Sequence, residues 1–148
     1  MKTQSLGFRF DNNKVLLVRK SSPEWQRGRL NGVGGSCETG EVPVATMVRE
    51  CYEETSIKTA PEEWKHIAVM SGADWRVYVF ASFGQISDAK TMTPKDTVVI
   101  ETAAYLPSDV LPNLYWLIPL CQDIEVQFPV IVSYCCHTGL VGVVLESI

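Results

Sequence analysis

The chain has 148 residues, of which 46% are hydrophobic and 20% charged, with 13 basic side chains (Lys and Arg) against 17 acidic ones (Asp and Glu) and a formal net charge of -4. This length predicts a single domain of residues 1–148, and the composition argues against disorder. No apolar run reaches the ~18 residues of a membrane-spanning helix, residues 1–7 lack the apolar stretch of a signal peptide, and the acidic balance argues against binding of nucleic-acid polymers.

The cysteines and the charge pattern refine this expectation. The five cysteines are odd in number and form no C-x-x-C pair, which favours reduced, mostly buried thiols in a cytoplasmic protein. Residues 1–30 contain seven basic and two acidic side chains, whereas residues 31–148 contain six basic and fifteen acidic ones. Such a division is compatible with an ordinary solvated surface. It is equally compatible with cations for a substrate's phosphates beside carboxylates for metal ions.

The N-terminal part predicts a hairpin, a long loop and a helix. Weak alternation over Leu6–Phe10, a turn at Asp11–Asn13 and the apolar segment Lys14–Arg19 predict two antiparallel strands. The segment Ser21–Gly40 is rich in Gly, Ser and Pro and too long for a simple connection. A helix is predicted over Val42–Ser56, because side chains at helical spacing give it one apolar face: Val44, Val48, Cys51, Tyr52 and Thr55.

The C-terminal part predicts further strands and a second helix. The expected elements, in chain order, are strands at Ile67–Met70, Val77–Phe83 and Val98–Tyr105, a helix at about Leu111–Cys121, and strands at Phe128–Tyr134 and Leu140–Leu145. Several strands combined with two helices predict a mixed α/β domain.

Three glutamates lie on the side of the first predicted helix opposite its apolar face. Glu50, Glu53 and Glu54 are spaced i, i+3, i+4, which places their carboxylates within about one helical turn. Like charges at this spacing destabilise a helix, so the arrangement is either a solvated acidic face or a site for hard divalent cations, which take oxygen ligands. Mg²⁺ typically shares its ligands between protein carboxylates and substrate phosphates, which makes a nucleotide a suitable partner.

The residues before this helix favour the metal site. The segment Gly32–Gly35 lets the backbone approach a ligand, Glu41 lies at the helix start, and Arg49 can bridge carboxylates. The ordered string is Gly35, five residues, Glu41, seven residues, and then Arg49-Glu50-Cys51-Tyr52-Glu53-Glu54-Thr55-Ser56-Ile57. It resembles the Nudix box, G-x5-E-x7-R-E-U-x-E-E-x-G-U with U apolar, and agrees with it at every charged position.

The string departs from the Nudix box at Cys51, which stands harmlessly at an apolar position, and at Ser56, which replaces the glycine that usually ends the helix. A serine held there in a left-handed conformation costs roughly 1 kcal/mol or more. The resemblance continues outside the box, in Leu30–Gly35 and in Pro112–Leu120. Membership of the Nudix hydrolases would imply an α/β fold, the α/β/α sandwich with a mixed β-sheet. It would also imply Mg²⁺-dependent hydrolysis of a nucleoside diphosphate linked to another group, with Mn²⁺ as a substitute metal.

The resemblance also implies roles for individual residues. Glu50, Glu53 and Glu54 would bind the metal, helped by a backbone carbonyl at Gly34 or Gly35. Glu41 and Arg49 would brace the loop and the helix. A further acidic ligand often comes from a later loop in this family, for which Asp96 is preferred over Glu101. Either Glu50 or Glu53 would accept the proton of the attacking water.

Residues that would bind the substrate are less sharply indicated. Arg19 and Lys20, at the end of the second strand, either contact phosphate oxygens or lie on the surface. Asn31 stands where purine-sanitising relatives hydrogen-bond the base, although it can equally stabilise the loop, and Asn113 is a second amide suited to a base edge. Three tryptophans either stack on a base or pack in the core: Trp25, Trp75 and Trp116.

Three functions are compatible with these residues. The first is hydrolysis of a nucleoside triphosphate to the monophosphate and pyrophosphate, and an oxidised purine nucleotide is one candidate substrate. The second keeps the chemistry but acts on ADP-ribose, a dinucleotide or a capped RNA end. The third is a non-catalytic nucleotide sensor, which would be expected to lose motif carboxylates that are all present here. The sequence does not distinguish a monomer from a homodimer.

Overall fold

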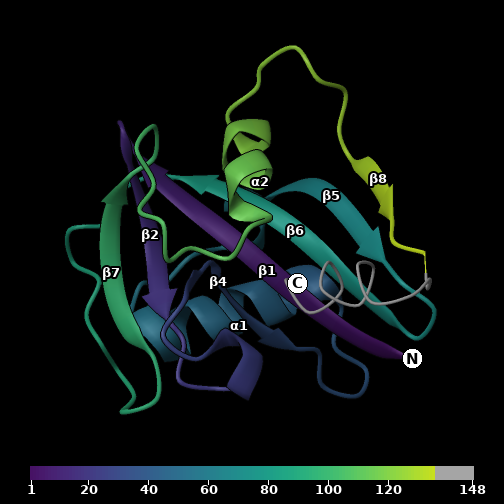
Figure 1. The fold of residues 1–148 in the computed structure, drawn as a ribbon, viewed down its shortest axis with the longest axis horizontal. Coiled ribbons are helices and arrows are strands. Elements are labelled where there is room, and N and C mark those ends of the chain that lie inside the picture. The colour runs from purple at the N-terminus through teal and green to yellow at the C-terminus, as the bar shows by residue number, and fades with distance from the viewer. Residues whose placement is uncertain (136–148) are drawn as a thin grey trace.

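The computed structural model describes residues 1–135, which form one mixed sheet with a helix on each face (Figure 1). The helices are α1 (Pro43–Thr55) and α2 (Leu114–Cys121), and two short 3₁₀ helices are η1 (Glu24–Gln26) and η2 (Pro61–Glu63). The strands are β1 (Lys2–Asp11), β2 (Lys14–Arg19), β3 (Leu30–Asn31), β4 (Val33–Ser36), β5 (Lys65–Ser71), β6 (Trp75–Phe83), β7 (Thr97–Thr102) and β8 (Val130–Ser133).

The sheet is mixed, as the sequence predicts. Its strand order is β3-β2-β1-β6-β5-β8, with β4 paired to β1 and β7 paired to β2. The pairs β1–β6 and β5–β8 are parallel, and the other pairs are antiparallel. The predicted hairpin is formed by β1 and β2, which turn at Asn12 with a positive φ of 54°.

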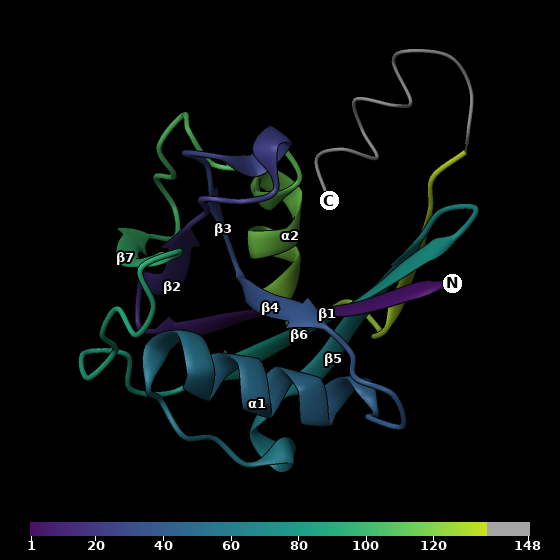
Figure 2. The same ribbon diagram turned by 90° about the horizontal axis from the view of Figure 1, so that it is seen from below.

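Two apolar cores cover the two faces of the sheet, because side chains alternate along each strand. On β2, Val15 and Leu17 belong to one core and Leu16 and Val18 to the other. The first core is closed by α2, and the second by α1 (Figure 2). This is the three-layered arrangement, helix, sheet, helix, that was expected.

The boundaries differ from the predictions at several places. The strand predicted to end at Tyr105 ends at Thr102, the second helix begins at Leu114 rather than Leu111, and the loop Ser21–Gly40 contains β3 and β4. The strand predicted at Leu140–Leu145 lies outside the described residues, as do Cys136 and His137. Among the four cysteines described, Cys51 and Cys121 are buried, whereas Cys37 is half-buried and Cys135 exposed, so the expectation of mostly buried thiols is met only in part.

Neither helix of residues 1–135 has the length and apolarity needed to cross a membrane. A cytoplasmic location remains a prediction.

Candidate active site

The helix α1 carries most of the residues expected to form the site. It begins at Pro43, whose fixed φ suits the first helical position, and it ends at Ser56, which has a left-handed φ of 66°. Its buried face differs from the prediction: Met47 is buried and Tyr52 is 44% exposed. Glu54, expected on the polar side, is only 7% exposed, because β4 packs across this part of the helix.

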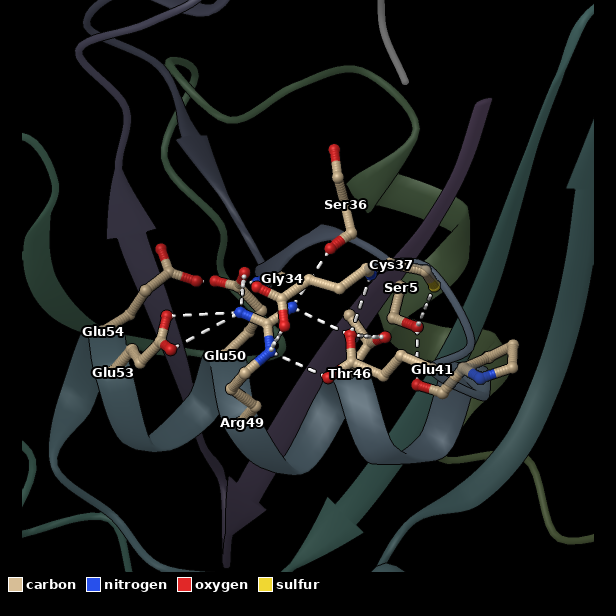
Figure 3. Close-up of polar contacts among 12 residues, drawn as sticks. Ser5, Gly34, Ser36, Cys37, Glu41, Thr46, Arg49, Glu50, Glu53 and Glu54 are labelled. Carbon is tan, nitrogen blue, oxygen red and sulfur yellow. Dashed lines mark hydrogen bonds and ion pairs between the residues drawn. The ribbon is translucent and has the colours of Figure 1, made fainter. Parts of the chain in front are cut away.

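Arg49 lies at the centre of the carboxylates (Figure 3). It donates from Nε and Nη2 to the two oxygens of Glu41, both at 2.9 Å, which is a bidentate pair. Its Nη1 donates to Glu50 at 2.9 Å and lies 3.3 Å from Glu53, and Nη2 also donates to the Ser36 carbonyl at 3.1 Å. The guanidinium therefore ties Glu50 and Glu53, within about one turn of α1, to the loop that precedes the helix.

Glu41 is held in place by more than Arg49. Its Oε1 also accepts hydrogen bonds from the Thr46 hydroxyl at 2.6 Å and from the Glu38 backbone N–H at 3.1 Å. The bonds from Arg49, Thr46 and Glu38, in that order, lower the pKa of Glu41 to about 2. The paired carboxylates raise the pKa of Arg49 in turn. Glu41 is thus ionised and fully hydrogen-bonded, which suits a bracing role.

Glu54 is buried beside the backbone of β4. Its Oε1 accepts the Gly34 backbone N–H at 2.9 Å. Burial raises the pKa of Glu54 to about 8, and this outweighs the opposite effects of the Gly34 N–H and the Lys20 charge, while Glu50 and Asp96 raise it further. A cation close to this buried carboxyl group would lower its pKa, because a positive charge favours the ionised form.

Glu50 lies against the other glycine of β4. A Cβ at Gly35 would collide with the Glu50 carboxylate, so this approach requires a glycine. Burial also raises the pKa of Glu50, against the lowering effect of Arg49. Glu53, by contrast, is open to water with its side chain 53% exposed.

Asp96 reaches this region from the connection between β6 and β7. It accepts a hydrogen bond from Lys20 Nζ at 3.0 Å and from the Ser21 backbone N–H at 3.3 Å, and it contributes to the raised pKa of Glu54. The alternative candidate Glu101 lies on β7, where it pairs with Val15 of β2. It is four residues beyond Thr97, or about 13 Å along the strand. The structure therefore brings Asp96, and not Glu101, to the carboxylates.

The oxygen atoms gathered here are of the kind that binds a hard divalent cation. In this structure, however, positively charged side chains of the protein pair with these carboxylates. Among residues 1–135, no three His, Cys, Asp or Glu side chains converge as a preformed metal site. Arg49 lies between Glu50 and Glu53, and Lys20 neutralises Asp96. The available ligands are nevertheless all oxygen atoms, namely the carboxylates of Glu50, Glu53, Glu54 and Asp96 and the carbonyls of β4, which is the set that Mg²⁺ prefers.

A cavity of about 100 Å³ lies beside the carboxylates. The glycines Gly34 and Gly35 line one part of it, and Lys20, Asn31 and Gln26 line another. This volume is below that of a typical ligand pocket, so it has room for the edge of a base rather than for a whole nucleotide.

The two candidate asparagines are placed differently. Asn31 lines the cavity, but its amide bonds to Gly32 N–H and to Gln26. Asn113 precedes α2 and is 4% exposed, and neither atom of its amide has a hydrogen-bond partner among the described residues. The Leu111 N–H donates to the Leu30 carbonyl at 2.9 Å, which holds this segment beside β3.

The remaining candidates are partly engaged elsewhere. Arg19 is paired with Asp109 at 2.6 Å and also donates to the Gly28 carbonyl. Trp75 packs against the core and the ring of Tyr134, whereas Trp25 and Trp116 are exposed. Sequence reasoning missed Gln26, because nothing in the loop Ser21–Gly40 marks one amide as buried beside Asn31.

Comparisons with known proteins agree with this geometry. The family model described as the NUDIX domain matches residues 4–119. A NUDIX hydrolase from Nitrosomonas europaea superposes with a TM-score of 0.71 at 19% identity, covering 89% of this chain and 78% of its own. A MutT protein from Bacillus halodurans gives 0.70 at 18% identity, covering 93% and 92%. The NUDIX domain of Shewanella oneidensis NrtR, solved with ADP ribose, gives 0.69 at 15% identity, covering 81% and 85%. At these identities the likeness shows the fold.

Proposed function

From the premise that this chain belongs to the NUDIX family and is a Nudix hydrolase acting on pyrophosphate bonds, we propose that it hydrolyses a nucleoside triphosphate to the monophosphate and pyrophosphate in the presence of Mg²⁺. The observation that carries the proposal is a small cavity lined by Gly34 and Gly35, the two glycines of β4 against which the carboxylates of Glu54 and Glu50 lie. A short anionic chain at the carboxylates would leave the base end of the nucleotide near Asn31 and Gln26.

The proposed metal ligands are Glu50, Glu53, Glu54 and Asp96, together with a backbone carbonyl of β4 at Gly34 or Gly35. Bound Mg²⁺ neutralises phosphate oxygens and lowers the pKa of an attacking water. Glu53 is open to water and Glu50 lies one turn away on the same helix, so either can accept the proton of that water. Arg49 and Glu41 keep the glutamates at fixed positions through their bidentate pair.

The proposed phosphate contact is Lys20, whose ammonium group already lies among the carboxylates through its pair with Asp96. The amide of Asn113, which does not line this cavity, is proposed as a second contact to the nucleotide base. It is buried with both polar atoms unpaired within the described chain, and such a group costs free energy unless a ligand satisfies it. Arg19 is assigned no more than a neighbouring positive charge, because Asp109 neutralises it.

A substrate panel tests this proposal. Nucleoside triphosphates, an 8-oxo-purine triphosphate, ADP-ribose and a dinucleoside polyphosphate are each incubated with Mg²⁺, and the products are separated. We expect a triphosphate to yield monophosphate and pyrophosphate. Glu53→Gln should lower kcat by at least about 100-fold with the same thermal melt, whereas Glu62→Gln, on exposed η2, should leave kcat unchanged.

The same panel decides against the proposal if the only substrate cleaved is ADP-ribose or a dinucleotide, which is the alternative that keeps the chemistry. Absence of turnover with every substrate, combined with tight nucleotide binding, would instead point to a sensor. Full activity of Glu53→Gln would mean that the carboxylates of α1 do not form the reacting centre.

A further inference from the structure

The cavity beside the carboxylates contains an amide pair whose orientation can be deduced. Asn31 and Gln26 are 6% and 8% exposed, and Asn31 Nδ2 donates to Gln26 Oε1 at 3.2 Å. Amide oxygen and nitrogen atoms are normally assigned from their hydrogen-bond partners, because the two ends have the same shape. Here the hydrogen-bond partners are compatible with only one orientation of each amide.

The deduction begins at the backbone. The Gly32 N–H can only donate, so the end of the Asn31 amide that lies 2.8 Å from it must be the oxygen. The other end of Asn31 is therefore the NH₂ group, which faces Gln26. Since that NH₂ group can only donate, the facing atom of Gln26 must be its oxygen. Gln26 is thereby left with its NH₂ group turned away from Asn31.

This NH₂ group is free to meet a ligand. It has no hydrogen-bond partner in the described part of the chain, and it is not among the fully buried unpaired atoms, which belong to His66, Asp109 and Asn113. Gln26 also lines the cavity. A ligand in the cavity would meet this group, which can offer hydrogen bonds but cannot accept them.

We propose that Gln26, locked by Asn31, is a specificity residue that selects bases carrying a carbonyl oxygen over bases carrying an amino group at the recognised edge. Guanine and thymine present oxygen acceptors at positions where adenine and cytosine present amino donors. A fixed NH₂ donor bonds to the first pair and repels the second. This inference rests on the proposed function, since it assigns the base end of a nucleotide to this cavity.

The test compares bases that share a ring system, purine with purine and pyrimidine with pyrimidine. The ratio of kcat/KM for dGTP over dATP, and for dTTP over dCTP, is measured with Mg²⁺ for the wild type, Gln26→Glu and Gln26→Leu. We expect each wild-type ratio to be roughly 10, the effect of about one hydrogen bond. Gln26→Glu keeps an oxygen for Asn31 Nδ2 and replaces the donor with an acceptor, so both ratios should fall to 1 or below. Its added negative charge lowers all four kcat/KM values together, and that effect cancels in the ratios.

Gln26→Leu, which has neither donor nor acceptor, should bring both ratios near 1. Gln85→Glu is the matched control, because this exposed amide bonds to Ser87 outside the cavity, and its ratios should equal those of the wild type. Thermal melts establish whether each variant folds. If Gln26→Glu does not fold, the ratios of the wild type and Gln26→Leu decide the test.

Wild-type ratios of 1, or variant ratios equal to the wild type, overturn this inference alone. Failure of the wild type to hydrolyse any triphosphate overturns the proposed function and this inference with it.

Discussion

At the scale of single residues, Glu54 has the environment with the clearest consequence for stability. Burial raises its pKa in the folded chain to about 8, whereas an unfolded glutamate has the ordinary value of 4.5. Between these two pH values the folded state keeps a proton that the unfolded state has released. The free energy of unfolding must therefore fall as pH rises through this window. A rise in pH favours the state that binds fewer protons, and here that is the unfolded state.

We predict that titration of Glu54 lowers the unfolding free energy of the metal-free protein by up to about 1 kcal/mol per pH unit between pH 5 and pH 8. The measurement is urea unfolding in the presence of a chelator. Glu54→Gln should flatten this dependence, because its amide oxygen can still accept the Gly34 N–H without titrating. Glu62→Gln changes an exposed glutamate and should retain the wild-type slope. Equal slopes for wild type and Glu54→Gln would contradict the burial argument.

The residue scale also shows what spacing alone can and cannot predict. The i, i+3, i+4 positions of Glu50, Glu53 and Glu54 do place them on neighbouring turns, and Arg49 does bridge carboxylates. The spacing could not predict that Glu54 is buried while Glu53 is exposed. That difference comes from β4, which packs beside one edge of the helix and offers the Gly34 N–H.

At the scale of elements, α1 ends at Ser56, the polar residue that replaces the glycine of the Nudix box. Ser56 has a φ of 66°, the left-handed conformation that costs a non-glycine residue roughly 1–2 kcal/mol. Glycine avoids this cost, although it loses more conformational entropy on folding. We predict that Ser56→Gly stabilises the protein by about 1 kcal/mol, or about 3 °C in Tm, as measured by thermal and urea unfolding.

Asn12→Gly provides the comparison for Ser56→Gly. Asn12 also has a positive φ, of 54°, but asparagine tolerates this conformation better than serine. Its gain on replacement by glycine should be smaller. A loss of stability in Ser56→Gly, or a larger gain in Asn12→Gly, would show that backbone strain at the end of α1 is not the dominant effect.

The elements themselves were predicted best where a periodic pattern is long. The helix α1 spans Pro43–Thr55 against the predicted Val42–Ser56, and the hairpin of β1 and β2 is found where expected. The strands β3 and β4 were missed, because they contain two and four residues and β4 includes two glycines. Such segments become strands only through pairing with β2 and β1, which is a tertiary contact rather than a local preference.

At the scale of the whole molecule, strand register decides which acid joins the carboxylates of α1. Arg19 of β2 pairs with Thr97 of β7, which places Lys20 and Asp96 together beyond the end of that pair. Glu101 lies farther along the same strand, opposite Val15. The sequence indicates both acids and a preference for Asp96, but the antiparallel register that separates them depends on the folded sheet.

This register leads to a prediction for Mg²⁺. A metal that binds only the folded protein raises its stability by mass action, by about 2.7 kcal/mol at a concentration of 100 times Kd. For a chain of this size we therefore expect Tm to rise by roughly 5–10 °C. Asp96→Asn should reduce this rise, because it removes a proposed ligand. Glu101→Gln removes the same charge from the other end of β7 and should leave the rise intact.

The quantity to compare is the difference in Tm with and without Mg²⁺, measured separately for each variant. Asp96→Asn also leaves Lys20 without its partner, so its Tm without metal can fall for a reason unrelated to ligation. The difference removes that contribution. A rise that survives in Asp96→Asn but is lost in Glu101→Gln would reverse the assignment, since the fourth carboxylate would then come from the far end of β7 rather than from the loop before it.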